Sequence, residues 1–175
     1  MNIFLTGYRG TGKTTVASIL GEQLGWSSLD SDATIQQRAE KTIAEIFASE
    51  GETAFRDWET SIITDLAAHD NLVIALGGGA ILREQNRNVI ASRGKTVWLR
   101  ADADTIHQRV SADKITVEQR PNLTTGGGLS EIREVLAERE PIYRQCADVS
   151  VDTEGKTPSS VAEEIIRLLN LEPTG

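Results

Sequence analysis

Short apolar runs alternate along this sequence with longer stretches whose apolar residues recur at helical spacing. Residues 3–5 form one short run, and residues 72–76 form an uninterrupted one, as expected for parallel strands that are covered on both faces. Similar runs predict strands at 28–30, 96–99 and 149–151. Between them the spacing predicts helices at residues 13–24, 34–40, 42–49, 52–68, 84–92, 103–110, in a stretch ending near 143, and at 159–169. This alternation, without repeats or linkers, predicts one α/β sandwich around a five-stranded parallel sheet.

The segment from residue 111 to residue 129 interrupts the alternation. It contains Pro121, the glycine run 126–128 and charges of both signs. A stretch of this length and composition is longer than an ordinary connection in a compact domain. It predicts a mobile surface segment.

Composition describes an ordinary globular chain of 175 residues, with 39% apolar and 25% charged residues. The formal net charge of −8 disfavours nucleic-acid binding through a basic surface. No apolar run is long enough to span a bilayer and the first residues resemble no targeting leader, so we expect a cytoplasmic protein that binds no membrane. The single cysteine, Cys146, has no disulfide partner, and we expect it half-buried near a helix end.

A phosphate-binding loop is the clearest local motif. The segment Gly7-Tyr8-Arg9-Gly10-Thr11-Gly12-Lys13-Thr14 fits G-x-x-x-x-G-K-[ST] between a predicted strand and a predicted helix. Glycines let backbone N–H groups approach phosphate oxygens, and the positive end of the next helix adds a partial charge. Lys13 is expected to reach the β- and γ-phosphates of ATP, and the Thr14 hydroxyl to bind Mg²⁺. The alternative, a glycine-rich turn with an accidental lysine, is disfavoured by the flanking elements.

Two carboxylates, Asp30 and Asp32, lie where the second predicted strand ends. In an open parallel sheet this end faces the ligand crevice, beside the phosphate loop. One carboxylate of such a pair can hold Mg²⁺, and the other can orient or deprotonate an attacking hydroxyl. From these residues by themselves, the pair is explained equally well without function, as one helix-capping carboxylate and one solvated acid.

Further motifs follow in an order that resembles the shikimate kinase family. They are Gly51-Glu52-x-x-Phe55-Arg56-x-x-Glu59, Gly77-Gly78-Gly79-Ala80, Arg120-Pro121, Arg139-x-Pro141-x-Tyr143-Arg144 and Val151-Asp152-Thr153. With the phosphate loop and the carboxylate pair they span nearly the whole chain. The phosphate loop is common to many NTPases, whereas the combination of Phe-Arg-x-x-Glu with the triple glycine is specific to the shikimate kinase pattern.

The resemblance implies one domain, residues 1–175, with the three-layer α/β/α fold of P-loop NTPases related to nucleoside monophosphate kinases. The acceptor-binding region would cover about 32–60, and a mobile lid about 111–128. The implied reaction is the ATP-dependent phosphorylation of the 3-hydroxyl of shikimate, toward chorismate and the aromatic amino acids. The implied cofactor is Mg²⁺, the implied partners are ATP and shikimate, and a monomer is expected.

The resemblance also implies roles in acceptor binding. Arg56 and Arg139 would clamp the shikimate carboxylate, because a planar fork of N–H donors matches a carboxylate in two places. Gly78 and Gly79 would leave room for the flat ring, and Asp32 would bind the reacting hydroxyl as the candidate base. Asp30 would act through Mg²⁺. Read without the family, Arg56 fits equally well an exposed helix ion pair with Glu52 and Glu59.

Catalysis and nucleotide binding draw on further residues by resemblance. Arg120 would be the lid arginine that moves onto the phosphates, which makes Lys13, Asp32 and Arg120 the expected catalytic set. Arg109 would stack on adenine, and Lys156 belongs to the expected adenine loop. The full nucleotide set is Gly10, Thr11, Gly12, Lys13, Thr14, Thr15, Arg109, Arg120 and Lys156. The lid departs from the family pattern, because Asn122 and Leu123 follow Arg120-Pro121 where two leucines are usual.

Three other functions compete with this interpretation. A gluconate or nucleoside monophosphate kinase would share the fold. A phosphate-bearing acceptor calls for more arginines than the two assigned here, whereas gluconate is a monocarboxylate that charge does not exclude, and only the Phe-Arg-x-x-Glu and triple-glycine motifs favour shikimate over it. A non-catalytic regulatory domain would be expected to lack Lys13, Asp32 or Arg120, and all three are present. A nucleic-acid-dependent motor is opposed by the acidic charge and the short chain.

Overall fold

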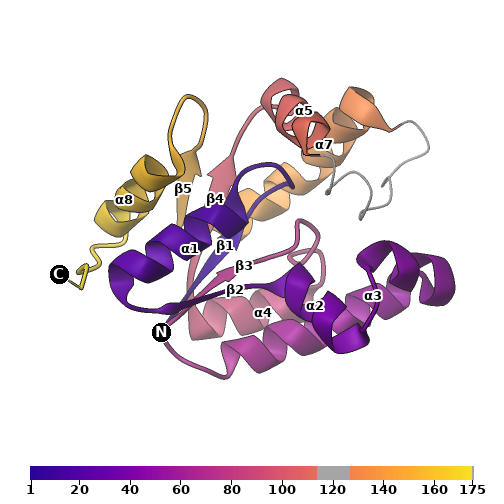
Figure 1. The fold of residues 1–175 in the computed structure, drawn as a ribbon, viewed down its shortest axis with the longest axis horizontal. Helices are drawn as coiled ribbons and strands as arrows, with labels where there is room; N and C mark the ends of the chain where they lie inside the picture. Colours follow the sequence, from indigo (N-terminus) through magenta and orange to yellow (C-terminus); the bar gives the residue numbers. More distant parts are fainter. Residues whose placement is uncertain (114–126, 175) are drawn as a thin grey trace.

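A computed structural model describes residues 1–113 and 127–174. Its centre is a five-stranded, all-parallel sheet in the order β2-β3-β1-β4-β5 (Figure 1). The strands are β1 (Asn2–Thr6), β2 (Ser27–Asp30), β3 (Leu72–Ala75), β4 (Gly94–Arg100) and β5 (Val149–Asp152). The helices are α1 (Lys13–Leu24), α2 (Ser31–Ala39), α3 (Ile43–Ala67), α4 (Glu84–Arg93), α5 (Ala103–Ala112), α7 (Gly128–Cys146) and α8 (Pro158–Leu168). The predicted three-layer α/β fold is therefore confirmed.

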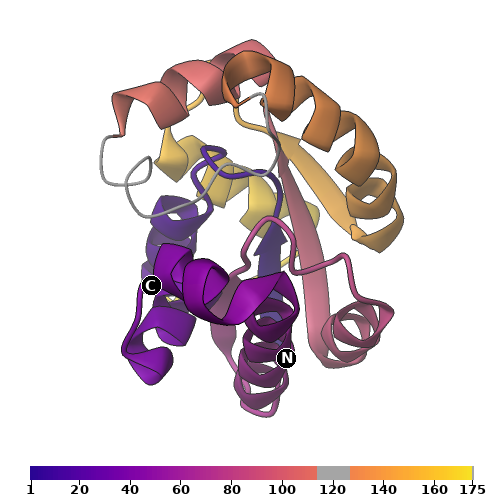
Figure 2. The ribbon, with the colours of Figure 1, turned by 90° about the vertical axis from the view of Figure 1, so that its right-hand side faces the viewer.

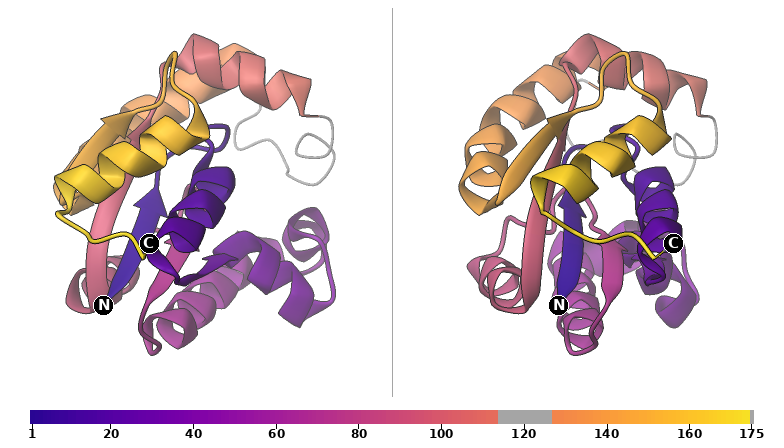
Figure 3. Two further views of the ribbon diagram at one scale, coloured as in Figure 1. Left: turned by 60° about the vertical axis from the view of Figure 1, so that its left-hand side comes forward. Right: turned by 90° about the vertical axis from the view of Figure 1, so that its left-hand side faces the viewer.

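Both faces of the sheet are covered, which explains why the strands read as continuous apolar runs. On one face, Ile3 and Leu5 pack with α1 and α8, which lie side by side (Figure 3). On the other face, Phe4 and Ile74 pack with α2, α3 and α4. Alternate residues of one strand thus serve opposite cores, because successive side chains point to opposite faces.

Two helical units flank the phosphate loop. The α2–α3 unit lies on one side of it and the α5–α7 pair on the other, as Figure 2 shows. Tyr8 of the loop packs into a small cluster with Ile106 of α5 and with Ile132, Val135 and Leu136 of α7. The loop is therefore anchored to the helices that carry one wall of the crevice.

The helix predictions hold with two local differences. α2 begins at Ser31 instead of residue 34, because the Asp30 side chain caps it by accepting from the backbone N–H groups of Asp32 and Ala33. The helices expected at 42–49 and 52–68 form one element, α3, interrupted at Gly51 by non-helical angles (φ 86°, ψ 173°). The capping box of Thr42 and Glu45 begins α3 as predicted.

Two remaining expectations concern the surface. Cys146 ends α7 and is half-buried, as predicted. Within the described ranges, no helix is both long and apolar enough to cross a membrane. Most of the expected lid, residues 114–126, lies outside the described residues.

Candidate active site

The phosphate loop connects β1 to α1 and leaves the first turn of α1 open. Gly12 caps α1 in a left-handed conformation (φ 85°) that residues with a side chain rarely adopt, and it offers no side chain to the helix N–H groups. Those N–H groups can therefore bind phosphate oxygens. Lys13 Nζ donates to the carbonyl oxygens of Gly7 (2.8 Å) and Tyr8 (2.9 Å), so the ammonium group lies over the loop.

A polar pocket lies beside the loop, where the phosphates of a nucleotide fit. Its lining is Arg9, Gly10, Gly12, Lys13, Thr14, Thr15, Asp30, Asp32, Leu76 and Asp113. A second pocket continues from it at the shared glycines Gly10 and Gly12 and is lined further by Thr11, Val16, Arg109, Thr153, Lys156, Pro158 and Val161. This second, less polar pocket has the position expected for the adenine of a nucleotide.

Arg109 and Lys156, which the family resemblance assigned to the adenine end, both line that second pocket, and each is held by hydrogen bonds or an ion pair. Arg109 donates to the Thr153 hydroxyl (2.9 Å) and carbonyl (3.2 Å) and to the Gly10 carbonyl (3.3 Å). Its planar guanidinium is thus fixed between β5 and the phosphate loop. Lys156 Nζ pairs with Glu164 at 2.6 Å.

Thr14 and Asp30 meet at the other side of the loop. The Thr14 hydroxyl donates to Asp30 Oδ2 at 2.5 Å, while Asp30 Oδ1 caps α2. The helix-cap interpretation of Asp30 and its position beside the loop are therefore both correct. Among the described residues, no three Asp, Glu, His or Cys side chains are grouped as a metal site. A hydroxyl beside one carboxylate would suit Mg²⁺, which keeps several waters and takes other ligands from phosphates.

Asp32 belongs to a different environment from Asp30. Its side chain is only 6% exposed, so it is not the solvated acid of the alternative interpretation. Asp32 lines the phosphate pocket and also a third pocket on the far side. A carboxylate between a phosphate site and a second ligand site can receive the proton of an attacking hydroxyl.

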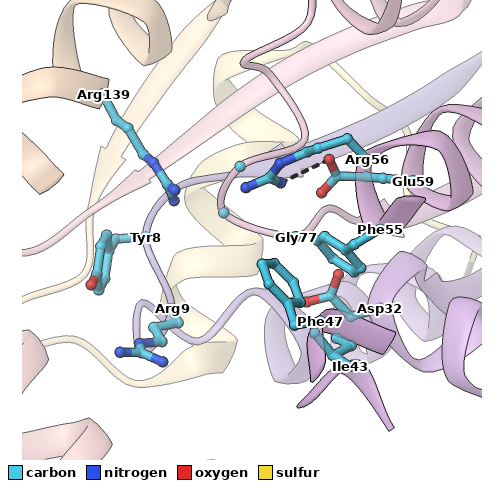
Figure 4. Close-up of a pocket in the computed structure, with 12 residues that line it drawn as sticks. Tyr8, Arg9, Asp32, Ile43, Phe47, Phe55, Arg56, Glu59, Gly77 and Arg139 are labelled. Atoms are coloured by element: carbon cyan, nitrogen blue, oxygen red, sulfur yellow. Dashed lines mark hydrogen bonds and ion pairs between the residues drawn. The ribbon is translucent and has the colours of Figure 1, made fainter. Parts of the chain in front are cut away.

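The third pocket is the candidate acceptor site (Figure 4). Arg56 from α3 and Arg139 from α7 point into it from opposite sides. Both are buried, each 8% exposed, which excludes an exposed helix ion pair for Arg56. The complete lining is Tyr8, Arg9, Asp32, Ile43, Phe47, Phe55, Arg56, Glu59, Gly77, Gly78, Gly79 and Arg139.

Glu59 holds the Arg56 guanidinium in place. Glu59 Oε2 accepts from Arg56 Nη1 at 2.9 Å, and Glu52 lies 3.5 Å from Arg56 Nη2. Glu59 is 1% exposed, and this burial raises its pKa to about 7 although Arg56 favours the charged form. The buried Glu59 carboxylate therefore fixes the direction of the Arg56 guanidinium.

The triple-glycine turn makes room for the protein's own side chains. A Cβ atom on Gly79 would lie 2.7 Å from Arg56 Nη2, and one on Gly77 would overlap the Asp32 carboxylate. The family resemblance implied that Gly78 and Gly79 clear space for a flat ring. Gly77 and Gly79 also make room for Asp32 and Arg56, the groups closest to them, and all three glycines line the third pocket.

Tyr143 ties the same turn to α7. Its hydroxyl donates to the Gly78 carbonyl at 2.5 Å, and its fully buried ring stacks on Trp98. Burial raises the Tyr143 pKa to about 12, so the hydroxyl remains a donor at neutral pH. Arg139 lies one helical turn before Tyr143, on the same face of α7.

The sequence did not single out the apolar wall of this pocket. Ile43, Phe47 and Phe55 form it, and the two phenyl rings lie 4.9 Å apart. Phe55 stood in a quoted motif, but an aromatic residue on a helix reads as ordinary core. Arg120, the expected lid arginine, lies outside the described residues.

Comparisons with known proteins agree with this geometry. Residues 9–170 match the family profile described as shikimate kinase. The shikimate kinase of Rhodopirellula baltica is 43% identical over 95% of this chain and 89% of its own, and that of Pseudomonas aeruginosa is 38% identical over 99% of both.

Solved structures show the same relationship. The shikimate kinase from Acinetobacter baumannii in complex with shikimate superimposes with a TM-score of 0.90, at 36% identity over 97% of this chain and 92% of that one. A gluconokinase from Sinorhizobium meliloti, at 16% identity and a TM-score of 0.56, shares only the fold. From its sequence, its fold and the arrangement of its pockets, the chain is a kinase that belongs to the shikimate kinase family.

Proposed function

We propose that this chain transfers the γ-phosphoryl group of ATP to the 3-hydroxyl of shikimate, giving ADP and shikimate 3-phosphate. The observation that carries the proposal is the position of Asp32. This buried carboxylate borders both the phosphate pocket and a pocket lined by two buried arginines. An alcohol that also bears a carboxylate fits that arrangement, since its hydroxyl reaches Asp32 while its carboxylate reaches the arginines.

The acceptor pocket supports a small, ring-shaped monocarboxylate. Arg56 and Arg139 offer two guanidinium forks from opposite sides, and each can bind carboxylate oxygens in two places. Phe47 and Phe55 supply an apolar wall for a carbocyclic ring. Glu59 and Glu52 offset part of the Arg56 charge, which suits a single negative charge better than the two of a nucleoside monophosphate.

In the reaction, the acceptor oxygen attacks the γ-phosphorus, the bond to the ADP oxygen breaks, and the hydroxyl proton passes to Asp32. Lys13 and the N–H groups at the start of α1 balance charge on the phosphate oxygens. Thr14 and Asp30 are the residues that would hold Mg²⁺, which supplies further charge neutralisation when bound. Positioning and charge balance contribute most of the rate in phosphoryl transfer.

Nucleotide binding and closure complete the proposal. Arg109 would stack on adenine with Lys156 beside it, supported by their positions in the adenine-side pocket. Arg120, in the lid, would cover the phosphates and exclude water, which would otherwise hydrolyse ATP. This role of Arg120 rests on the family resemblance.

A coupled assay of ADP release tests the acceptor. Shikimate, gluconate and nucleoside monophosphates are compared at equal concentration with Mg-ATP. We expect turnover with shikimate to exceed that with the other acceptors by at least about 100-fold, because they lack either the ring or the matching charge. The proposed function is wrong if shikimate does not stimulate ADP release.

Two substitutions separate the halves of the site. Arg139→Ala should mainly raise the KM for shikimate, because it removes a carboxylate ligand. Lys13→Ala should mainly lower kcat, because its charge acts on the phosphates in the transition state. The reverse pattern would contradict the assignment of the two pockets.

A further inference from the structure

Arg9 occupies the junction between the two substrate sites. It is the second of the four positions that the phosphate-loop motif leaves open, so the motif assigns it no role. In the structure it lines the phosphate pocket and the acceptor pocket. Among the described residues, Arg9 and Asp32 are the two side chains that these pockets share.

The Arg9 side chain is held in this position from behind. It is 13% exposed, and its Nη2 lies 4.0 Å from Oε2 of Glu131, which is 1% exposed. Its guanidinium carbon lies 5.9 Å from the centre of the Tyr8 ring. Glu131 stands in the first turn of α7, where the helix end favours a negative charge.

The hydrogen-bonding capacity of Arg9 is largely unused. In the ranges that the structure covers, the Arg9 guanidinium lies close to the Tyr8 hydroxyl and 4.0 Å from the Glu131 carboxylate, and its Nε is buried without a hydrogen-bond partner. Arg56 differs, because Glu59 accepts from it at 2.9 Å. A largely buried guanidinium with open donors, facing two pockets, is suited to an anionic ligand with several oxygens.

We propose that Arg9 binds the phosphoryl group as it passes from ATP to the acceptor oxygen, and that Glu131 positions Arg9 for this contact. This inference rests on the proposed function. While the bond to ADP breaks and the new phosphorus–oxygen bond forms, Arg9 donates N–H groups to the phosphoryl oxygens and gains or loses no proton. Arg9 is thus a catalytic residue opposite Asp32, and Glu131 is a positioning residue.

The test compares Arg9→Met with Arg133→Met. Arg133 also lies on α7, but it is 62% exposed and its ion pair with Asp104 is at the surface, so its loss should leave kcat and both KM values unchanged. Arg9→Met should lower kcat about 100-fold, with the KM for shikimate changed less than about threefold. A kcat within about threefold of the wild type would overturn the proposal.

Two further outcomes distinguish a phosphoryl contact from other roles. If Arg9→Met raises only the KM for shikimate, Arg9 is a carboxylate ligand and the proposal is wrong. If Arg9→Met fails to fold, Arg9→Lys is measured instead, which keeps the charge but not the fork and should lower kcat about tenfold. Added guanidinium ion should restore part of the activity of Arg9→Ala, and no recovery would argue against a direct contact.

The part played by Glu131 is tested by a double-mutant cycle. Glu131→Gln should lower kcat with both KM values unchanged, and it should have no further effect in the Arg9→Met background. Additive effects of the two substitutions would show that Glu131 does not act through Arg9. The activity of the wild type separates the two proposals. If the wild type releases no ADP in response to shikimate, the proposed function is wrong. If the wild type is active and Arg9→Met is equally active, only this inference is wrong.

Discussion

Replacing Gly79 by Ala should damage shikimate binding more than any other property of the enzyme. The new Cβ would lie 2.7 Å from Arg56 Nη2 and 2.8 Å from its Cζ. The backbone at Gly79 is not left-handed, so alanine adopts it without strain. The guanidinium must therefore move, and Glu59 at 2.9 Å limits where it can go.

The size of the effect follows from what this movement breaks. Relief of the overlap requires a shift of roughly 1 Å, enough to lose one charge-assisted hydrogen bond to the acceptor carboxylate, or about 1.5–3 kcal/mol. At about 1.4 kcal/mol per tenfold change, the KM for shikimate should rise between about 10- and 100-fold. The flexible end of an arginine can give way, so stability should change little.

The assay measures kcat and both KM values by ADP release, with thermal unfolding as the check on folding. Gly77→Ala is the matched variant, because it adds the same methyl group to the same turn but overlaps Asp32. It should mainly lower kcat. If Gly79→Ala binds shikimate within about threefold of the wild type, Arg56 does not hold the carboxylate in the way proposed.

Three other predictions follow from the site. Because the pKa of Glu59 is raised to about 7, the folded state binds a proton more tightly than the unfolded chain, and the stability that this gives is present at low pH and lost as pH rises through 7. In urea unfolding, the free energy of unfolding of the wild type, compared with that of Glu59→Gln, should fall by about 3 kcal/mol between pH 4.5 and 8. Tyr143→Phe removes the donor to the Gly78 carbonyl and should raise the KM for shikimate about fivefold with the KM for ATP unchanged in steady-state assays. Thr14→Ala and Asp30→Asn should each raise the Mg²⁺ concentration for half-maximal activity, measured by titration at saturating ATP, and equal Mg²⁺ dependence in all three proteins would contradict the assigned site.

The sequence by itself determined the order and type of the elements. Apolar runs and helical spacing reflect local backbone geometry, which neighbouring residues dictate. For the same reason, short segments of sequence were enough to predict the phosphate loop, the capping box of Thr42 and the helix interruption at Gly51. Asp32 was a candidate from its place after the second predicted strand, whereas Arg56 and Arg139 came from the family resemblance. Local spacing could not bring the three together.

Only the tertiary structure decided which of these residues meet. The strand order places β3 between β1 and β2, so the glycine turn after β3 meets the phosphate loop after β1 and Asp32 after β2. Burial, which depends on that packing, raised the pKa of Glu59 and made Arg56 a buried side chain paired with Glu59 instead of a surface ion pair. It also left Arg9 with open donors between two pockets, a position that no local pattern encodes because it depends on side chains from distant parts of the chain.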